Sequence, residues 1–159
     1  FKKINAVKYL NYNKKKFDLI LIKQTIHFFT LKEIKKLLNC SYSKLNPEGV
    51  ILILSLEAKN NEIPTFSLMK KKLQQSFKKE TLIKKDILKF KKEKIITKFN
   101  FKVSITKKKY IKMIEQRYIS SLLNLNDVQI SKGIKEIEIK YKDKITFNDR
   151  LNCIMFTKN

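Results

Sequence analysis

The chain has 159 residues, of which 43% are hydrophobic, and this combination predicts one globular domain (residues 1–159) with a real hydrophobic core. Lys and Arg number 37 against 14 Asp and Glu, so the formal net charge is +23. We expect no membrane span and no signal peptide, because no apolar run approaches the ~18 residues that a span requires. Two distant cysteines and a single histidine argue against a zinc site, and two lone thiols favour a reducing, cytoplasmic setting.

The positive charge has two interpretations. Lys neutralises phosphates, so a nucleic-acid-binding surface is one of them. The other is a compositional bias, because Lys, Asn, Ile, Phe and Tyr are enriched while Gly, Pro and Trp are scarce, as in A/T-rich codons. We favour the second, since a dedicated nucleic-acid site more often uses Arg, and Arg occurs only at Arg117 and Arg150. The lysine runs at 14–16, 70–72 and 107–109 also fall on unrelated predicted elements.

Taken in chain order, the first strong element is a strand. Residues 19–22 form a continuous apolar run, which is typical of a strand covered on both faces. The polar residues Lys23, Gln24 and Thr25 follow directly, and His27 lies just beyond. Ligands of open α/β sheets bind beyond the carboxyl ends of the strands, so we expect the functional site here.

A helix and a second strand follow. Residues 30–45 predict a helix that begins with a Thr30 and Glu33 capping box. Residues 50–56 predict a second buried strand, parallel to the first by a right-handed crossover, and Glu57 ends it. The predicted apolar face of the helix comprises Leu31, Ile34, Leu37, Leu38, Tyr42 and Leu45.

The rest of the chain predicts further helices and two strands. Apolar residues alternate strictly through residues 94–105, which indicates an antiparallel or edge strand with one buried face. Gly133 weakens the pattern of the last helix. In order, we expect a loop at 59–64, helices at 65–79 and 81–90, a strand at 94–105, helices at 107–123 and 126–141, and a strand at 145–157.

Three stretches resemble class I S-adenosylmethionine-dependent methyltransferases. Residues 17–29, from Phe-Asp-Leu to His-Phe-Phe, resemble the fourth strand of that family, FDL(I/V) followed by (L/I)-H-H/F. Residues 45–54 resemble the fifth, L-K-P-G-G-x-L-(I/L), with Asn46 for Lys and Glu48 for the first Gly. Residues 145–158 resemble the last strand, which inserts antiparallel. The implied fold class is α/β: a partial Rossmann-like sheet of parallel strands plus an antiparallel carboxyl-terminal strand, with helices on both faces.

The resemblance also implies that part of the family pattern is missing. A complete domain begins with a strand, a Gly-rich GxGxG turn and a helix, and an acidic residue after the second strand binds the ribose hydroxyls of the cofactor. Gly49 and Gly133 are the only glycines, so this chain cannot contain that turn. We therefore expect the carboxyl-terminal part of a methyltransferase domain, with residues 59–92 and 106–143 as helical cover on the substrate side. The strand at 19–22 would then be an exposed apolar edge.

S-adenosyl-L-methionine is the cofactor that the resemblance implies, and no metal is expected. Ala6 occupies the loop position near the adenine at the end of the family's third strand. Lys23 and Gln24 take the place of the residues that face the methionine part of the cofactor. His27 is the candidate catalytic residue, as a general base near the methyl group; the alternative is that it packs on the following helix.

Three further residues are candidates for binding the substrate. Glu57, at the end of the second strand, would contact an amine or hydroxyl, or is a solvated carboxylate. Arg117 stands out in a chain that prefers Lys, which suggests bidentate binding of a carboxylate, or an intramolecular ion pair. Tyr118 beside it is a substrate contact or a core residue. The predicted helices that contain Arg117 and Gly133 resemble those that cover the pocket in small-molecule members of the family.

The sequence therefore predicts methyl transfer from S-adenosylmethionine to a small-molecule acceptor, with this chain a truncated portion of the enzyme. Two alternatives remain open. One is a non-enzymatic basic module that binds nucleic acid, and the other is a catalytically silent methyltransferase relative. The sequence leaves the acceptor and the oligomeric state open.

Overall fold

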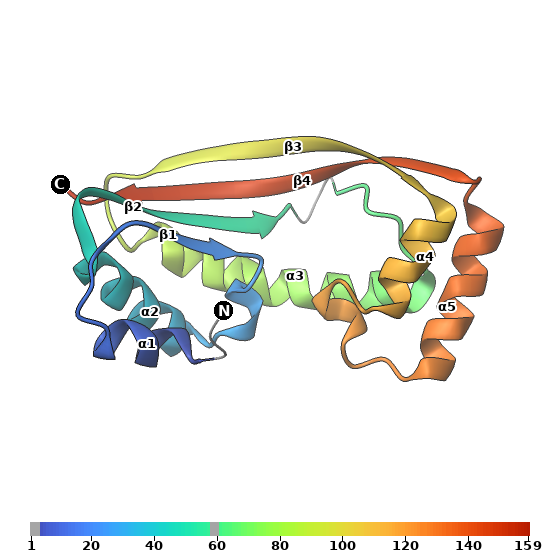
Figure 1. Ribbon diagram of the computed structural model, residues 1–159, viewed down its shortest axis with the longest axis horizontal. Coiled ribbons are helices and arrows are strands. Elements are labelled where there is room, and N and C mark those ends of the chain that lie inside the picture. Colours follow the sequence, from blue (N-terminus) through green and yellow to red (C-terminus); the bar gives the residue numbers. More distant parts are fainter. Residues whose placement is uncertain (1–3, 58–60) are drawn as a thin grey trace. The chain divides into compact units, whose positions relative to one another are not determined.

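The computed structural model of the chain describes residues 4–57 and 61–159, and it divides into two compact units (Figure 1). Unit 1 comprises Phe1–Leu56, Lys79–Phe99 and Leu151–Asn159, and unit 2 comprises Glu57–Lys78 and Asn100–Arg150. One long helix and two strands run through both units. The single domain expected from chain length therefore stays a prediction.

Four strands form one sheet in the order β1-β2-β4-β3. β1 (Phe17–Lys23) pairs parallel with β2 (Leu45–Leu56), and β4 (Lys144–Thr157) pairs antiparallel with β2. β4 therefore lies between β2 and β3 (Ile95–Thr106), and β1 and β3 are the edges. This arrangement confirms the predicted mixed α/β class with an antiparallel closing strand. It also confirms that β1 is an edge strand.

The helices agree with the sequence pattern where local signals fix their ends. The predicted capping box of Thr30 with Glu33 is formed, and the structure adds a second one, of Asn126 with Gln129. The helices are α1 (Ala6–Tyr12), α2 (Leu31–Ser43), α3 (Ser67–Leu88), α4 (Lys107–Glu115) and α5 (Asp127–Lys140), with short 3-10 turns η1 (Ile26–Phe28) and η2 (Ser120–Leu122).

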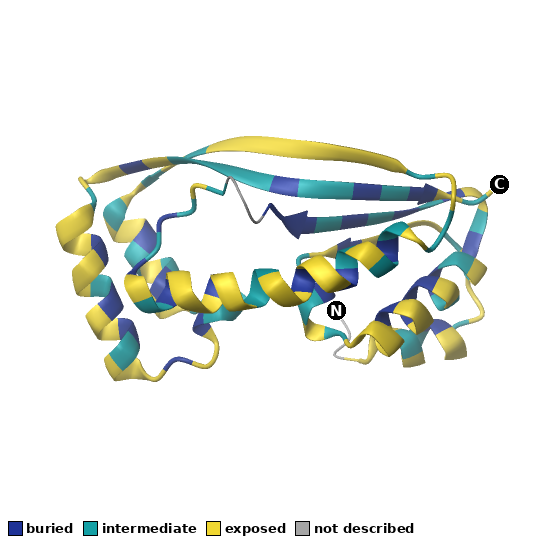
Figure 2. Ribbon diagram, turned by 180° about the vertical axis from the view of Figure 1, so that it is seen from behind, coloured by how far each residue is buried: buried dark blue, intermediate teal, exposed yellow. Residues whose placement is uncertain are grey.

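In unit 1 one face of the sheet is covered. Ile22, Ile53 and Phe156 point into a core shared with α1, α2 and the last turns of α3. On the opposite face Leu19 and Leu21 are 55% and 51% exposed. Among the described residues of this unit the helices lie on one side of the sheet, as Figures 1 and 2 show, so the burial of both faces of β1 that its apolar run predicted was wrong. A uniformly apolar run suits a strand between two layers, but it does not reveal whether both layers are present.

β3 also differs from its predicted burial. Its alternation predicted one buried face, but Figure 2 shows the strand exposed along most of its length. Ile95, Phe99 and Phe101 are each more than half exposed. The edge position was predicted correctly, but the covering layer that would bury one face was not found in the described residues.

Several element boundaries needed correction. Residues 4–7 were expected to end a strand, but Asn5 accepts the Lys8 N–H at 3.1 Å and caps α1, so Ala6 begins a helix. The helices expected at 65–79 and 81–90 are one helix, α3. The helix expected at 107–123 ends early, because Arg117 has a left-handed backbone with φ 51°.

Two backbone positions explain local choices of residue. Glu48 has φ 60°, in the region that Gly adopts without strain, and it occupies the place of a Gly in the resembling motif. A Cβ on Gly133 would lie 2.6 Å from the Phe66 ring, so the glycine allows this ring to pack closely against α5. That helix is continuous despite its glycine because the contact with Phe66 compensates for the weak helix propensity of Gly.

Candidate functional site

Lys23 and Gln24, the two polar residues singled out from the sequence, lie at the carboxyl end of β1. Lys23 pairs with Leu54 of β2 and is exposed to solvent. Gln24 has φ 51°, and its N–H donates to the Leu54 carbonyl at 2.7 Å. The left-handed residue turns the chain away from the sheet directly after the strand. Both side chains therefore lie at the strand end, as predicted.

His27 lies in η1 and faces helix α3. Its Nδ1 is 3.2 Å from Glu80 Oε1, at an ion-pair distance but without the alignment of a hydrogen bond, and the two side chains are 12% and 9% exposed. Lys79 donates to the His27 carbonyl at 2.8 Å. This geometry agrees with the packing alternative, and a general-base role stays a prediction. Glu80 was not singled out, since only the fold brings it to His27.

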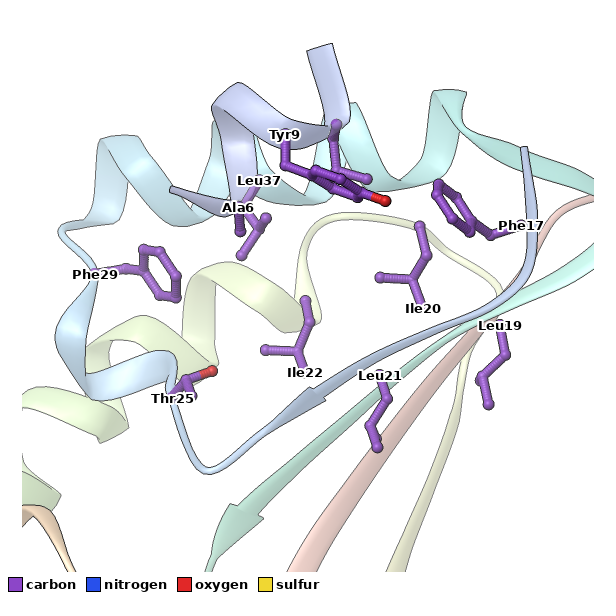
Figure 3. Close-up of a pocket in the computed structure, with 11 residues that line it drawn as sticks. Ala6, Tyr9, Phe17, Leu19, Ile20, Leu21, Ile22, Thr25, Phe29 and Leu37 are labelled. Carbon is purple, nitrogen blue, oxygen red and sulfur yellow. The ribbon is translucent and has the colours of Figure 1, made fainter. Parts of the chain in front are cut away.

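An apolar groove of about 300 Å³ runs along β1 (Figure 3). Ala6 and Thr25 belong to its lining, whereas Lys23 and Gln24 do not. Ile20 and Ile22 point towards the helices, and Leu19 and Leu21 point to the opposite side of the strand. The lining comprises Ala6, Tyr9, Leu10, Phe17, Leu19, Ile20, Leu21, Ile22, Thr25, Phe29 and Leu37. Because none of these side chains is charged, the groove suits an apolar or aromatic group rather than a phosphate.

Unit 2 contains the predicted substrate residues Glu57 and Arg117. Glu57 is 7% exposed, and its N–H donates to the Arg150 carbonyl at 2.8 Å. The Arg117 guanidinium donates to Asp127 Oδ1 at 2.7 Å and to the Leu125 carbonyl at 3.3 Å. Arg117 thus adopts the intramolecular ion pair that the sequence left open, and Glu57 is not a solvated carboxylate. Roles in substrate binding remain predictions for both.

Tyr118, whose side chain is partly exposed, contacts the buried phenol of Tyr110. Its hydroxyl lies 2.9 Å from that of Tyr110, which donates to the Pro64 carbonyl. Burial raises the pKa of Tyr118 to about 12, and the nearby Asp149 carboxylate adds to the rise. Burial also raises the pKa of Tyr110, with a further contribution from Tyr118. Both phenols are therefore neutral at physiological pH.

Sequence reasoning missed two residues that interact with Tyr118. Neither Tyr110 nor Asp149 was singled out as a candidate. A signal was present for Asp149, because β4 alternation places it on the same face as Ile145 and Phe147, which pack in the unit 2 core. A carboxylate on the inward face of a strand is unusual and marks a candidate site.

The candidate residues thus form two groups. Ala6, Lys23, Gln24 and His27 belong to unit 1 and surround the end of β1, while Glu57, Arg117 and Tyr118 belong to unit 2. Among residues 4–57 and 61–159 no cluster of three or more His, Cys, Asp or Glu could hold a metal ion. Within the same ranges no helix combines the length and apolar character that crossing a bilayer requires.

No protein-family model matches the chain, and no curated protein matches it. Among solved structures it is similar to Haemonchus contortus phosphoethanolamine N-methyltransferase 2 in complex with phosphomonomethylethanolamine and S-adenosylhomocysteine, with 18% identity and a TM-score of 0.44 over 97% of this chain and 36% of that chain. The selenomethionine form of the same enzyme, in complex with S-adenosyl-L-methionine, gives 18% identity and a TM-score of 0.40 over 94% and 35%. The chain spans about a third of the length of these structures, and a likeness at this level does not define a function.

Proposed function

We propose that this chain is the carboxyl-terminal part of an S-adenosylmethionine-dependent methyltransferase that acts on a small molecule. The observation that carries the proposal is the strand order β1-β2-β4-β3, with β1 and β2 parallel and the last strand inserted antiparallel beside β2. The motifs at residues 17–29 and 45–54 require this order if they are the fourth and fifth strands of the family sheet. They form adjacent parallel strands.

The described residues fit the cofactor in part. Ala6 and Thr25 lie in an apolar groove that suits an aromatic ring, and Lys23 at the end of β1 offers a cation to a carboxylate. The chain has only two glycines and so lacks the Gly-rich turn, and we place the ribose-binding acid of the family pattern upstream with that turn. We infer that an upstream segment of a longer polypeptide completes the site.

The contribution of this chain would be positioning and exclusion of water. When bound, S-adenosylmethionine supplies an activated methyl group that a nucleophile attacks in line. Apolar side chains such as Phe17 and Phe29 would keep water from the cofactor, and the polar residues after β1 would orient it. His27 would hold η1 against α3 through Glu80, so its first role is to shape the strand end.

Cofactor binding by the longer polypeptide tests the proposal. Lys23→Ala should weaken binding of S-adenosylmethionine by roughly tenfold, because a charge-assisted contact would be lost. Lys16→Ala is the matched control, since Lys16 is equally exposed but precedes β1, and its affinity should not change. If both variants bound S-adenosylmethionine with the affinity of the unmodified protein, Lys23 would not contact the cofactor. Steeply salt-dependent binding to any duplex, without cofactor binding, would favour the nucleic-acid alternative instead.

A further inference from the structure

We draw no further inference here: the strongest candidate, the apolar groove along β1 together with the uncovered sheet face of Leu19 and Leu21 beside it, belongs to the site already described, because the upstream segment inferred above would cover it and nothing in the described residues indicates another occupant.

Discussion

Strands β1 and β3 both lie at an edge of the sheet, but their side chains differ. β3 carries Lys98 and Lys102 within its length, and charged residues deter pairing with another chain. β1 is apolar from Leu19 to Ile22, with charge only at Asp18 and at its last residue. The apolar groove runs along the same strand. β3 thus carries charges typical of a strand that ends a sheet, whereas β1 has the composition of a strand with another strand on each side.

The difference supports the inference that an upstream segment pairs with β1. Parallel strands are usually buried on both faces, and β1 is parallel to β2 but covered on one face only. In a longer polypeptide, a second layer of structure would cover the exposed side chains of Leu19 and Leu21. The predictions below begin with the largest expected effect.

Substitutions on the two faces of β1 should differ most. Ile22→Ala should lower the free energy of unfolding of this chain by about 2–4 kcal/mol, because Ile22 is 6% exposed in the unit 1 core. Leu21→Ala should lower it by less than about 1 kcal/mol, since that side chain is half exposed. Urea unfolding measures both. Equal losses would mean that the outer face of β1 is already covered.

Loss of the contact between η1 and α3, beyond the end of β1, should give the next largest change in the free energy of unfolding. Glu80→Ala should destabilise the chain by about 1–3 kcal/mol, because it leaves the His27 imidazole buried without its carboxylate. Lys78→Ala, at an exposed position two residues earlier, is the control. A double-mutant cycle with His27→Ala should show a coupling of at least about 0.5 kcal/mol, and no coupling would argue against the pair.

The first residues of β2, where its register with β1 shifts, should become more stable by substitution. Glu48→Gly should raise the free energy of unfolding by about 1 kcal/mol, because Gly adopts the φ of 60° at this position without strain. Thermal unfolding gives the result. Pro47→Gly is the contrasting variant, since it adds flexibility to the unfolded chain with no such relief and should destabilise. A loss of stability in Glu48→Gly would show that its side chain matters more than its backbone.

Substitutions that change the charge of the edge strands should affect stability least but should clearly change self-association of the chain. Leu21→Lys should change the free energy of unfolding by less than about 0.5 kcal/mol, yet reduce self-association of the isolated chain, because it adds charge to the β1 edge. Lys102→Val removes charge from the β3 edge and should increase self-association. Sedimentation velocity compares the two. If both variants associate like the unmodified chain, the edges do not differ in the way proposed.

The sequence predicted what local chemistry determines. The capping box at Thr30, the apolar run of β1 and the motif of the last strand each lie within a few residues, and each was found as expected. The β4 position next to β2 followed from a resemblance rather than from periodicity. Alternation in β3 gave the strand but not its burial, since burial depends on a layer that the pattern does not contain.

The candidate site was harder to predict because its contacts are long-range. Nothing near His27 in the sequence identifies Glu80, 53 positions later, as its partner. The left-handed backbone of Arg117 interrupts a regular helical pattern, and this break is what gives Tyr118 its place beside Tyr110. Such positions depend on tertiary packing, which overrides local propensity.

The most direct test of the account is calorimetric titration of S-adenosylmethionine into two proteins: this chain, and a longer polypeptide that includes the upstream reading frame. The account predicts binding by the longer polypeptide and at least about 100-fold weaker binding by the 159-residue chain, because the proposed function assigns the Gly-rich turn and the strand beside β1 to an upstream segment. Equal affinity in the two proteins, or no binding by the longer one, would contradict it.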